Sequence, residues 1–103
     1  VYDSRASTFL DLMGLGLRNM PSEVANLTSL TRLSFTDNQL TTLPPSIGRL
    51  TNLTDLSLVD NNVKTLPKEL GKLTQLQSLS LAFNELISIP MELGHLDQLS
   101  ALA

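Results

Sequence analysis

Leucine and other apolar residues recur along this chain in a fixed pattern. One copy occupies residues 53–75, where the apolar positions are Leu53, Leu56, Leu58, Val63, Leu66, Leu70 and Leu73. Leu56 and Leu58 are two residues apart, which places both side chains on one face of a β-strand. The steps of three and four residues that follow Leu66 favour a short helix. The same spacing returns in residues 30–52 and 76–98, so a period of 23 residues predicts stacked units that bury their apolar residues against one another.

Each copy also has an asparagine after its predicted strand, a proline before its predicted helix and a glycine near the helix end. These residues are Asn38, Asn61 and Asn84; Pro44, Pro67 and Pro90; and Gly48, Gly71 and Gly94. An amide side chain offers donors and an acceptor to the backbone of a tight turn, so we expect the asparagines to form a structural ladder. Proline suits the first turn of a helix, and a residue without Cβ suits the closing turn.

The pattern LxxLxLxxNxLxxLPxxLGxLxxL can be read in three consecutive units, and it resembles the repeat of the leucine-rich repeat family. The period and the LP and LG pairs are most similar to the intracellular, Ras-group-related class. The resemblance implies an α/β solenoid, a segment of a horseshoe with a parallel sheet on its concave face and short helical or 3₁₀ turns on its convex face. It also implies a protein-binding module that acts as a scaffold or regulator in intracellular signalling.

We expect one repeat domain over residues 7–103, preceded by an irregular N-terminal end at residues 1–6. Its units are 7–29, 30–52, 53–75 and 76–98, with a partial unit at 99–103. The first unit departs from the pattern, because Leu15 stands at the asparagine position and Ser7 at the leading leucine. The last unit stops at its strand, which favours a fragment of a longer array whose uncapped ends self-associate end to end. The alternative is that these units are the whole gene product.

Composition restricts the partners of the chain. Its net charge of −3 argues against binding to nucleic acid or to an anionic membrane surface. No apolar run is long enough for a membrane span. The absence of cysteine favours the reducing cytoplasm, although an extracellular location stays open if disulfide-bonded end caps are missing from the sequence.

Residues between the core leucines of each strand are expected on the concave face. The residues predicted there to bind a protein partner are Arg32, Asp37, Asp55, Asp60, Phe83 and Glu85. Because the acidic residues outnumber the single cation, they predict an acidic trough that suits a basic partner surface. An ordinary solvated sheet is the alternative. Phe83 is expected either to anchor a partner or to pack sideways on the next strand.

Nothing in the sequence has the spacing of a catalytic site. The single histidine, His95, shares its repeat position with Arg49 and Lys72, which we expect on the convex face. No base is placed to activate a serine, and no metal-ligand spacing or phosphate loop is present, so we expect no enzyme activity, metal or cofactor. Two alternatives to a signalling module remain: a recognition fragment of a larger enzyme, such as a receptor kinase or ubiquitin ligase, and a purely architectural spacer.

Overall fold

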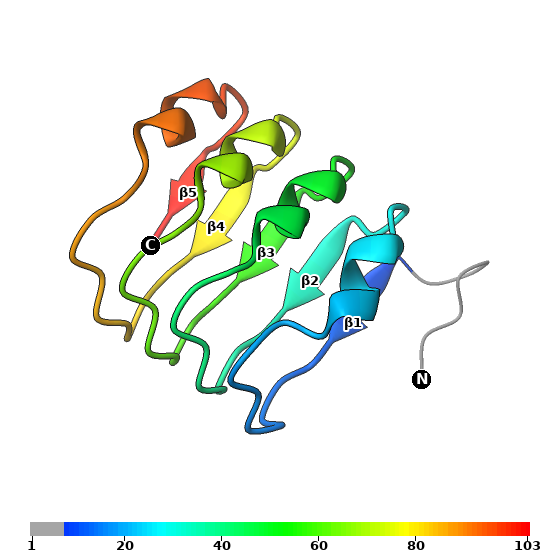
Figure 1. Ribbon diagram of the computed structural model, residues 1–103. Coiled ribbons are helices and arrows are strands. Elements are labelled where there is room, and N and C mark those ends of the chain that lie inside the picture. Colours follow the sequence, from blue (N-terminus) through cyan, green and yellow to red (C-terminus); the bar gives the residue numbers. More distant parts are fainter. Residues whose placement is uncertain (1–7) are drawn as a thin grey trace.

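The computed structural model describes residues 8–103, so the expectations for residues 1–6 and for Ser7 lie outside it. Four coils and the strand of a fifth unit stack side by side, and each contributes one strand to a parallel sheet with the order β1-β2-β3-β4-β5 (Figure 1). The strands are β1 (Phe9–Asp11), β2 (Arg32–Ser34), β3 (Asp55–Ser57), β4 (Ser78–Ser80) and β5 (Ala101–Leu102).

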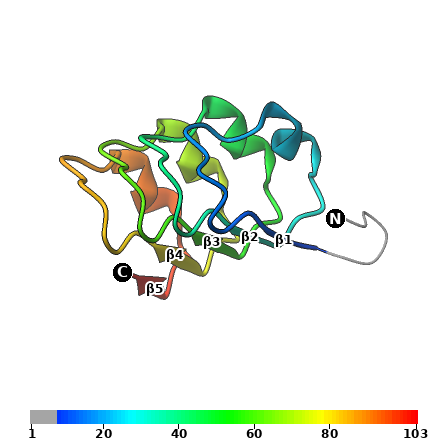
Figure 2. The same ribbon diagram turned by 90° about the horizontal axis from the view of Figure 1, so that it is seen from below.

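Short 3₁₀ helices lie opposite the sheet. They are η1 (Ser22–Asn26), η2 (Pro45–Arg49), η3 (Lys68–Lys72) and η4 (Met91–His95). Figure 2 shows the sheet on one side of the molecule and the helices on the other. The predicted solenoid with a parallel sheet and 3₁₀ turns is therefore confirmed. Within residues 8–103, no helix has the length and apolar character needed to cross a membrane.

The strand register follows the repeat period. Leu33 pairs with Leu56, Leu56 with Leu79 and Leu79 with Leu102, so each core leucine lies beside its equivalent in the next coil. Leu33, Leu56 and Leu79 are buried. Apolar residues of the helices, such as Leu70, complete the same core from the opposite side. One continuous column of leucines thus replaces the separate cores that single units are too small to form.

The three repeated prolines precede the 3₁₀ helices, whereas Pro45 is the first residue of η2. Pro44, Pro67 and Pro90 are extended residues at the N-cap, with φ of −75°, −74° and −70°. The carbonyl oxygen of Pro67 accepts the first hydrogen bond of η3 from Leu70 N at 3.1 Å. Proline suits this position because its φ is already fixed and its missing N–H is not needed there.

Two of the repeated glycines, Gly48 and Gly71, permit close packing between coils; they lie near the helix end as expected, but they do not close the turn with a positive φ. Gly48 and Gly71 lie inside η2 and η3, and neither has a positive φ. A Cβ atom on Gly71 would lie only 2.7 Å from the carbonyl oxygen of Glu92 in η4, and one on Gly48 would lie 3.0 Å from that of Glu69. A hydrogen in place of the methyl group therefore lets neighbouring 3₁₀ helices approach each other.

The repeated asparagines join consecutive coils. Asn61 is 6% exposed, and its Nδ2 donates to Phe35 O in the preceding coil at 2.9 Å and to Leu58 O in its own coil at 3.1 Å. Its Oδ1 accepts from Leu40 N at 3.0 Å. Asn84 makes the equivalent bonds one coil later.

Asn38 makes these bonds for the first turn, which has no asparagine of its own. Its Oδ1 accepts from Leu15 N at 3.1 Å and from Leu17 N at 2.9 Å, and its Nδ2 donates to Leu12 O at 2.8 Å. The first turn is thus stabilised by the asparagine of the following coil, although Leu15 stands at its own asparagine position.

Candidate functional site

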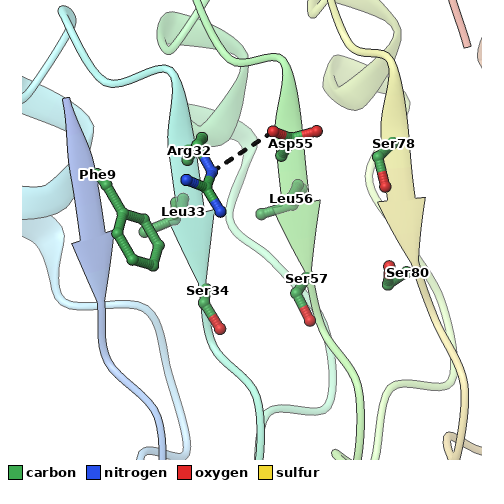
Figure 3. A pocket seen from close by; sticks show the side chains of 9 residues that line it. All are labelled: Phe9, Arg32, Leu33, Ser34, Asp55, Leu56, Ser57, Ser78 and Ser80. Atoms are coloured by element: carbon green, nitrogen blue, oxygen red, sulfur yellow. Dashed lines mark ion pairs between the residues drawn. The ribbon is translucent and has the colours of Figure 1, made fainter.

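Strand residues that alternate with the core leucines form two rows on the exposed side of the sheet, which we call the sheet face. The rows are Phe9–Arg32–Asp55–Ser78 and Asp11–Ser34–Ser57–Ser80. Most of these side chains line an open hollow of about 230 Å³ (Figure 3). Because parallel strands hold the rows in register, the hollow exists before any partner binds.

Arg32 is the centre of the first row. Its guanidinium carbon lies 4.7 Å from the centre of the Phe9 ring, a cation–π geometry, and its Nε lies 3.5 Å from Asp55 Oδ2 (Figure 3). The Arg32 and Asp55 side chains are 59% and 46% exposed, so their ion pair contributes about 0–1 kcal/mol to stability. The two contacts therefore orient Arg32 between β1 and β3 more than they stabilise the fold.

Hydroxyl groups connect the second row. Thr36 Oγ1 lies 2.8 Å from Ser57 Oγ and 3.0 Å from Ser34 Oγ. Ser57 Oγ also accepts from Val59 N at 3.4 Å. These hydrogen bonds hold small side chains close to the strands, so the backbone of a bound partner can approach the sheet without displacing large groups.

Of the residues predicted on the concave face, only Arg32 and Asp55 lie in these rows. Asp37, Asp60 and Phe83 lie in the bends that follow the strands, with left-handed φ of 59°, 61° and 60°. The prediction assumed that strand alternation continues to these positions. It does not, because each strand ends earlier and the residue at the bend has a left-handed conformation.

Glu85 also lies beyond the strands, just after the bend at Phe83, and its N–H bonds to Val63 O. The sheet-face rows therefore contain two carboxylates, Asp11 and Asp55, against Arg32. Asp55 is already paired with that arginine. The rows alone thus do not contain the predicted acidic trough, since Asp37 and Asp60 lie at the bends that follow, and a trough over both parts stays a prediction.

Phe9 belongs to the candidate site although it is not among the predicted binding residues. The signal for it is the repeat period, which sets Phe9 beside Arg32 in the strand register. His95 ends η4 and is exposed, just as Arg49 and Lys72 end η2 and η3. It lies on the helix side of the solenoid, as expected, away from the serine rows.

Known structures share this architecture. A leucine-rich repeat protein of Leptospira interrogans, LIC12759, is 33% identical over 98% of this chain, with a TM-score of 0.84. The leucine-rich repeat domain of the type III effector XopL is 25% identical over 94%, with a TM-score of 0.83. The BIR2 ectodomain of Arabidopsis thaliana is 26% identical over 89%, with a TM-score of 0.74.

This chain spans 32%, 36% and 50% of those three chains, respectively. A search of curated protein sequences gives no match. The family model described as a leucine-rich repeat region matches residues 8–103, which is nearly the whole sequence. The repeat pattern, the stacked parallel strands and this match agree, and the chain belongs to the leucine-rich repeat family.

Proposed function

We propose that this chain binds a protein partner on its sheet face. The observation that carries the proposal is the arrangement of Arg32, which lies against Phe9 and Asp55 beside rows of small hydroxyl side chains. Leucine-rich repeat domains generally mediate protein–protein interactions, and they are typically not catalytic. The sheet face is the surface of this chain where the polar and aromatic groups are already in fixed register.

The physical basis is a low cost of ordering on binding. The sheet backbone is fixed by the parallel ladder and by leucines that are fully buried, such as Leu56 and Leu58. A rigid surface loses little conformational entropy when a partner binds. Arg32 carries several N–H donors and is more than half exposed, so it can donate to a partner while it stays against the Phe9 ring. Arginine and aromatic residues are the side chains that most often dominate binding energy at interfaces.

The finer role within this proposal is that of a scaffold or regulator in cytoplasmic signalling, in the intracellular Ras-group-related class. The 23-residue period with its LP and LG pairs supports that class, and the absence of cysteine in the sequence supports that compartment.

The test is a peptide selection against the chain, followed by affinity measurements on surface variants. Ser57→Arg places a large charged side chain in the middle of the sheet face, and Thr74→Arg places the same side chain on an exposed turn outside the sheet. We expect selected ligands to lose about tenfold or more in affinity for Ser57→Arg and to keep their affinity for Thr74→Arg.

Arg32→Ala should weaken the same ligands while leaving the fold intact, because its side chain is largely exposed. Ligands that bind the parent, Ser57→Arg and Arg32→Ala equally would refute binding on the sheet face. Selection that yields no ligand at all would favour the purely architectural role.

A further inference from the structure

The sheet face holds a cation and an anion side by side on neighbouring strands, Arg32 on β2 and Asp55 on β3. Both side chains line the hollow. Their contact runs from Arg32 Nε to Asp55 Oδ2 at 3.5 Å, and Figure 3 shows the two terminal nitrogens of Arg32 extending beyond that contact. Neither side chain makes a hydrogen bond within residues 8–103. The pair therefore offers N–H donors and carboxylate acceptors next to each other.

Hydroxyl groups surround this pair with uncharged donors and acceptors. Ser34, Thr36 and Ser57 have three hydroxyl protons for the two hydrogen bonds that join them, so one O–H stays available whichever way those bonds run. Ser78 and Ser80 also line the hollow, and their side chains have no hydrogen bond in the described part of the chain. A bound partner therefore meets polar groups with unused hydrogen-bonding capacity across the whole floor of the hollow.

A charged ligand is poorly matched to the hollow, because the only charged residues among its lining are Arg32 and Asp55. A carboxylate that accepts from Arg32 lies beside the like charge of Asp55, and an ammonium group that donates to Asp55 lies beside Arg32. The other charge in the rows is Asp11 on β1, whose Oδ1 accepts from Met13 N at 3.1 Å. Asp11 adds repulsion for an anion and leaves the repulsion between Arg32 and a cation in place.

A carboxamide, the group that ends an asparagine or glutamine side chain, matches the pair in charge and in hydrogen bonding. It has no charge, and its C=O acceptor and NH₂ donors lie on one edge. It can therefore accept from Arg32 while it donates to Asp55. A backbone peptide unit does not have this edge, because the C=O and N–H of a trans peptide point in opposite directions.

We propose that the Arg32–Asp55 pair recognises the carboxamide of an asparagine or glutamine on the bound protein partner. This inference rests on the proposed function, because it names the side chain that the sheet face selects. The hydroxyls of Ser57 and Ser80 are then left for polar groups of the neighbouring partner residues, which the small side chains of the second row allow to approach.

The test uses four pools of synthetic peptides with randomised flanks. The pools differ only in the central residue, which is glutamine, glutamate, lysine or leucine. We expect the chain to retain the glutamine pool about tenfold more strongly than any other pool, the effect of one hydrogen bond to a charged group. Ser57→Arg should remove this retention, and Thr74→Arg on an exposed turn outside the sheet should preserve it.

Neutralising each charge separately tests the pair itself. Asp55→Asn removes the repulsion of a carboxylate, so the glutamate pool should rise to the level of the glutamine pool. Arg32→Gln removes the repulsion of an ammonium group, so the lysine pool should rise in the same way. Asp97→Asn is the matched control, because it removes the same charge from an exposed turn outside the sheet and should change no preference. A merely structural role of the pair would instead weaken all four pools alike.

The outcomes separate this proposal from the proposed function. Equal retention of all four pools that Ser57→Arg abolishes would overturn carboxamide recognition and leave binding on the sheet face intact. Strongest retention of the glutamate or lysine pool would also overturn it, and the lysine pool would favour the basic partner expected from the sequence. Retention that Ser57→Arg does not change, or no retention of any pool, would overturn both proposals.

Discussion

Replacing Asn61 by alanine tests how the coils are held together. The Asn61 Nδ2 group donates to three carbonyl oxygens, and Oδ1 accepts the N–H of Leu40 at 3.0 Å. The neighbouring Asn62 is an exposed residue with no side-chain hydrogen bond among the described residues, so Asn62→Ala is a matched control.

The structure shows which of these groups the substitution leaves unpaired. Without Asn61, Phe35 O still accepts a hydrogen bond from Asn38 Nδ2 at 2.9 Å, and Leu58 O still accepts one from Asn84 Nδ2 at 2.7 Å. Val59 O still accepts a hydrogen bond from the backbone N–H of Asp37. Leu40 N–H, in a fully buried residue, has no second acceptor in the described part of the chain. An unpaired buried donor costs about 1–3 kcal/mol. With the weakened shared bonds and the space left by the amide, we expect Asn61→Ala to lower the free energy of unfolding by roughly 3 kcal/mol.

Urea unfolding followed by circular dichroism measures this difference, provided that the dependence on urea is the same for both variants. Asn62→Ala should stay within about 0.5 kcal/mol of the parent, as expected for an exposed surface residue. If Asn61→Ala also stays within that range, the asparagine ladder does not hold the coils together. The claim that the hydrogen bonds of Asn61 stabilise the fold would then be refuted.

Four other substitutions have outcomes that the same unfolding assay can check. Gly71→Ala should destabilise the fold by about 1–3 kcal/mol, because the new methyl group overlaps Glu92. Gly94→Ala should be neutral or stabilising by up to about 1 kcal/mol, because nothing lies within 4 Å of its Cβ position. Leu58→Ala should cost about 2–5 kcal/mol, since its side chain is fully buried in the core. Phe83→Asn should stabilise the chain by about 1 kcal/mol, because asparagine tolerates the left-handed conformation better.

Each of these predictions can be contradicted by a specific result. Equal effects at Gly71 and Gly94 would show that contact between helices is not the reason for glycine. A small effect of Leu58→Ala would mean that the core collapses around the missing side chain. Loss of stability in Phe83→Asn would show that the phenylalanine packs within its own chain and that this packing outweighs the cost of its left-handed conformation.

The repeat period accounts for most of what could be predicted. Parallel coils of equal length force residue i to lie beside residue i + 23, so the columns of Leu33, Leu56 and Leu79 and the pair of Arg32 and Asp55 follow from the sequence. The short spacing from each proline to the next strand leaves room only for a brief helix, which is why the 3₁₀ turns were also predictable.

The tight turn at each asparagine was predicted, but the left-handed conformation of the residue before it was not, because side-chain alternation was extended past the end of each strand. A signal was present: Gly14, Asp37 and Asp60 share one position, and all three residue types tolerate a positive φ. The role of Gly71 in helix packing could not be predicted from the sequence. Whether a glycine closes a turn or admits a neighbouring coil depends on the distance between the coils, and spacing along the chain does not determine that distance.

Chemical-shift mapping of the backbone amides, with a selected peptide ligand added to the labelled chain, tests the binding surface most directly. Binding on the sheet face predicts that the largest changes fall on β2, β3 and β4, around Arg32, Ser57 and Ser80. Changes confined to η2, η3 and η4 on the opposite side would contradict that account.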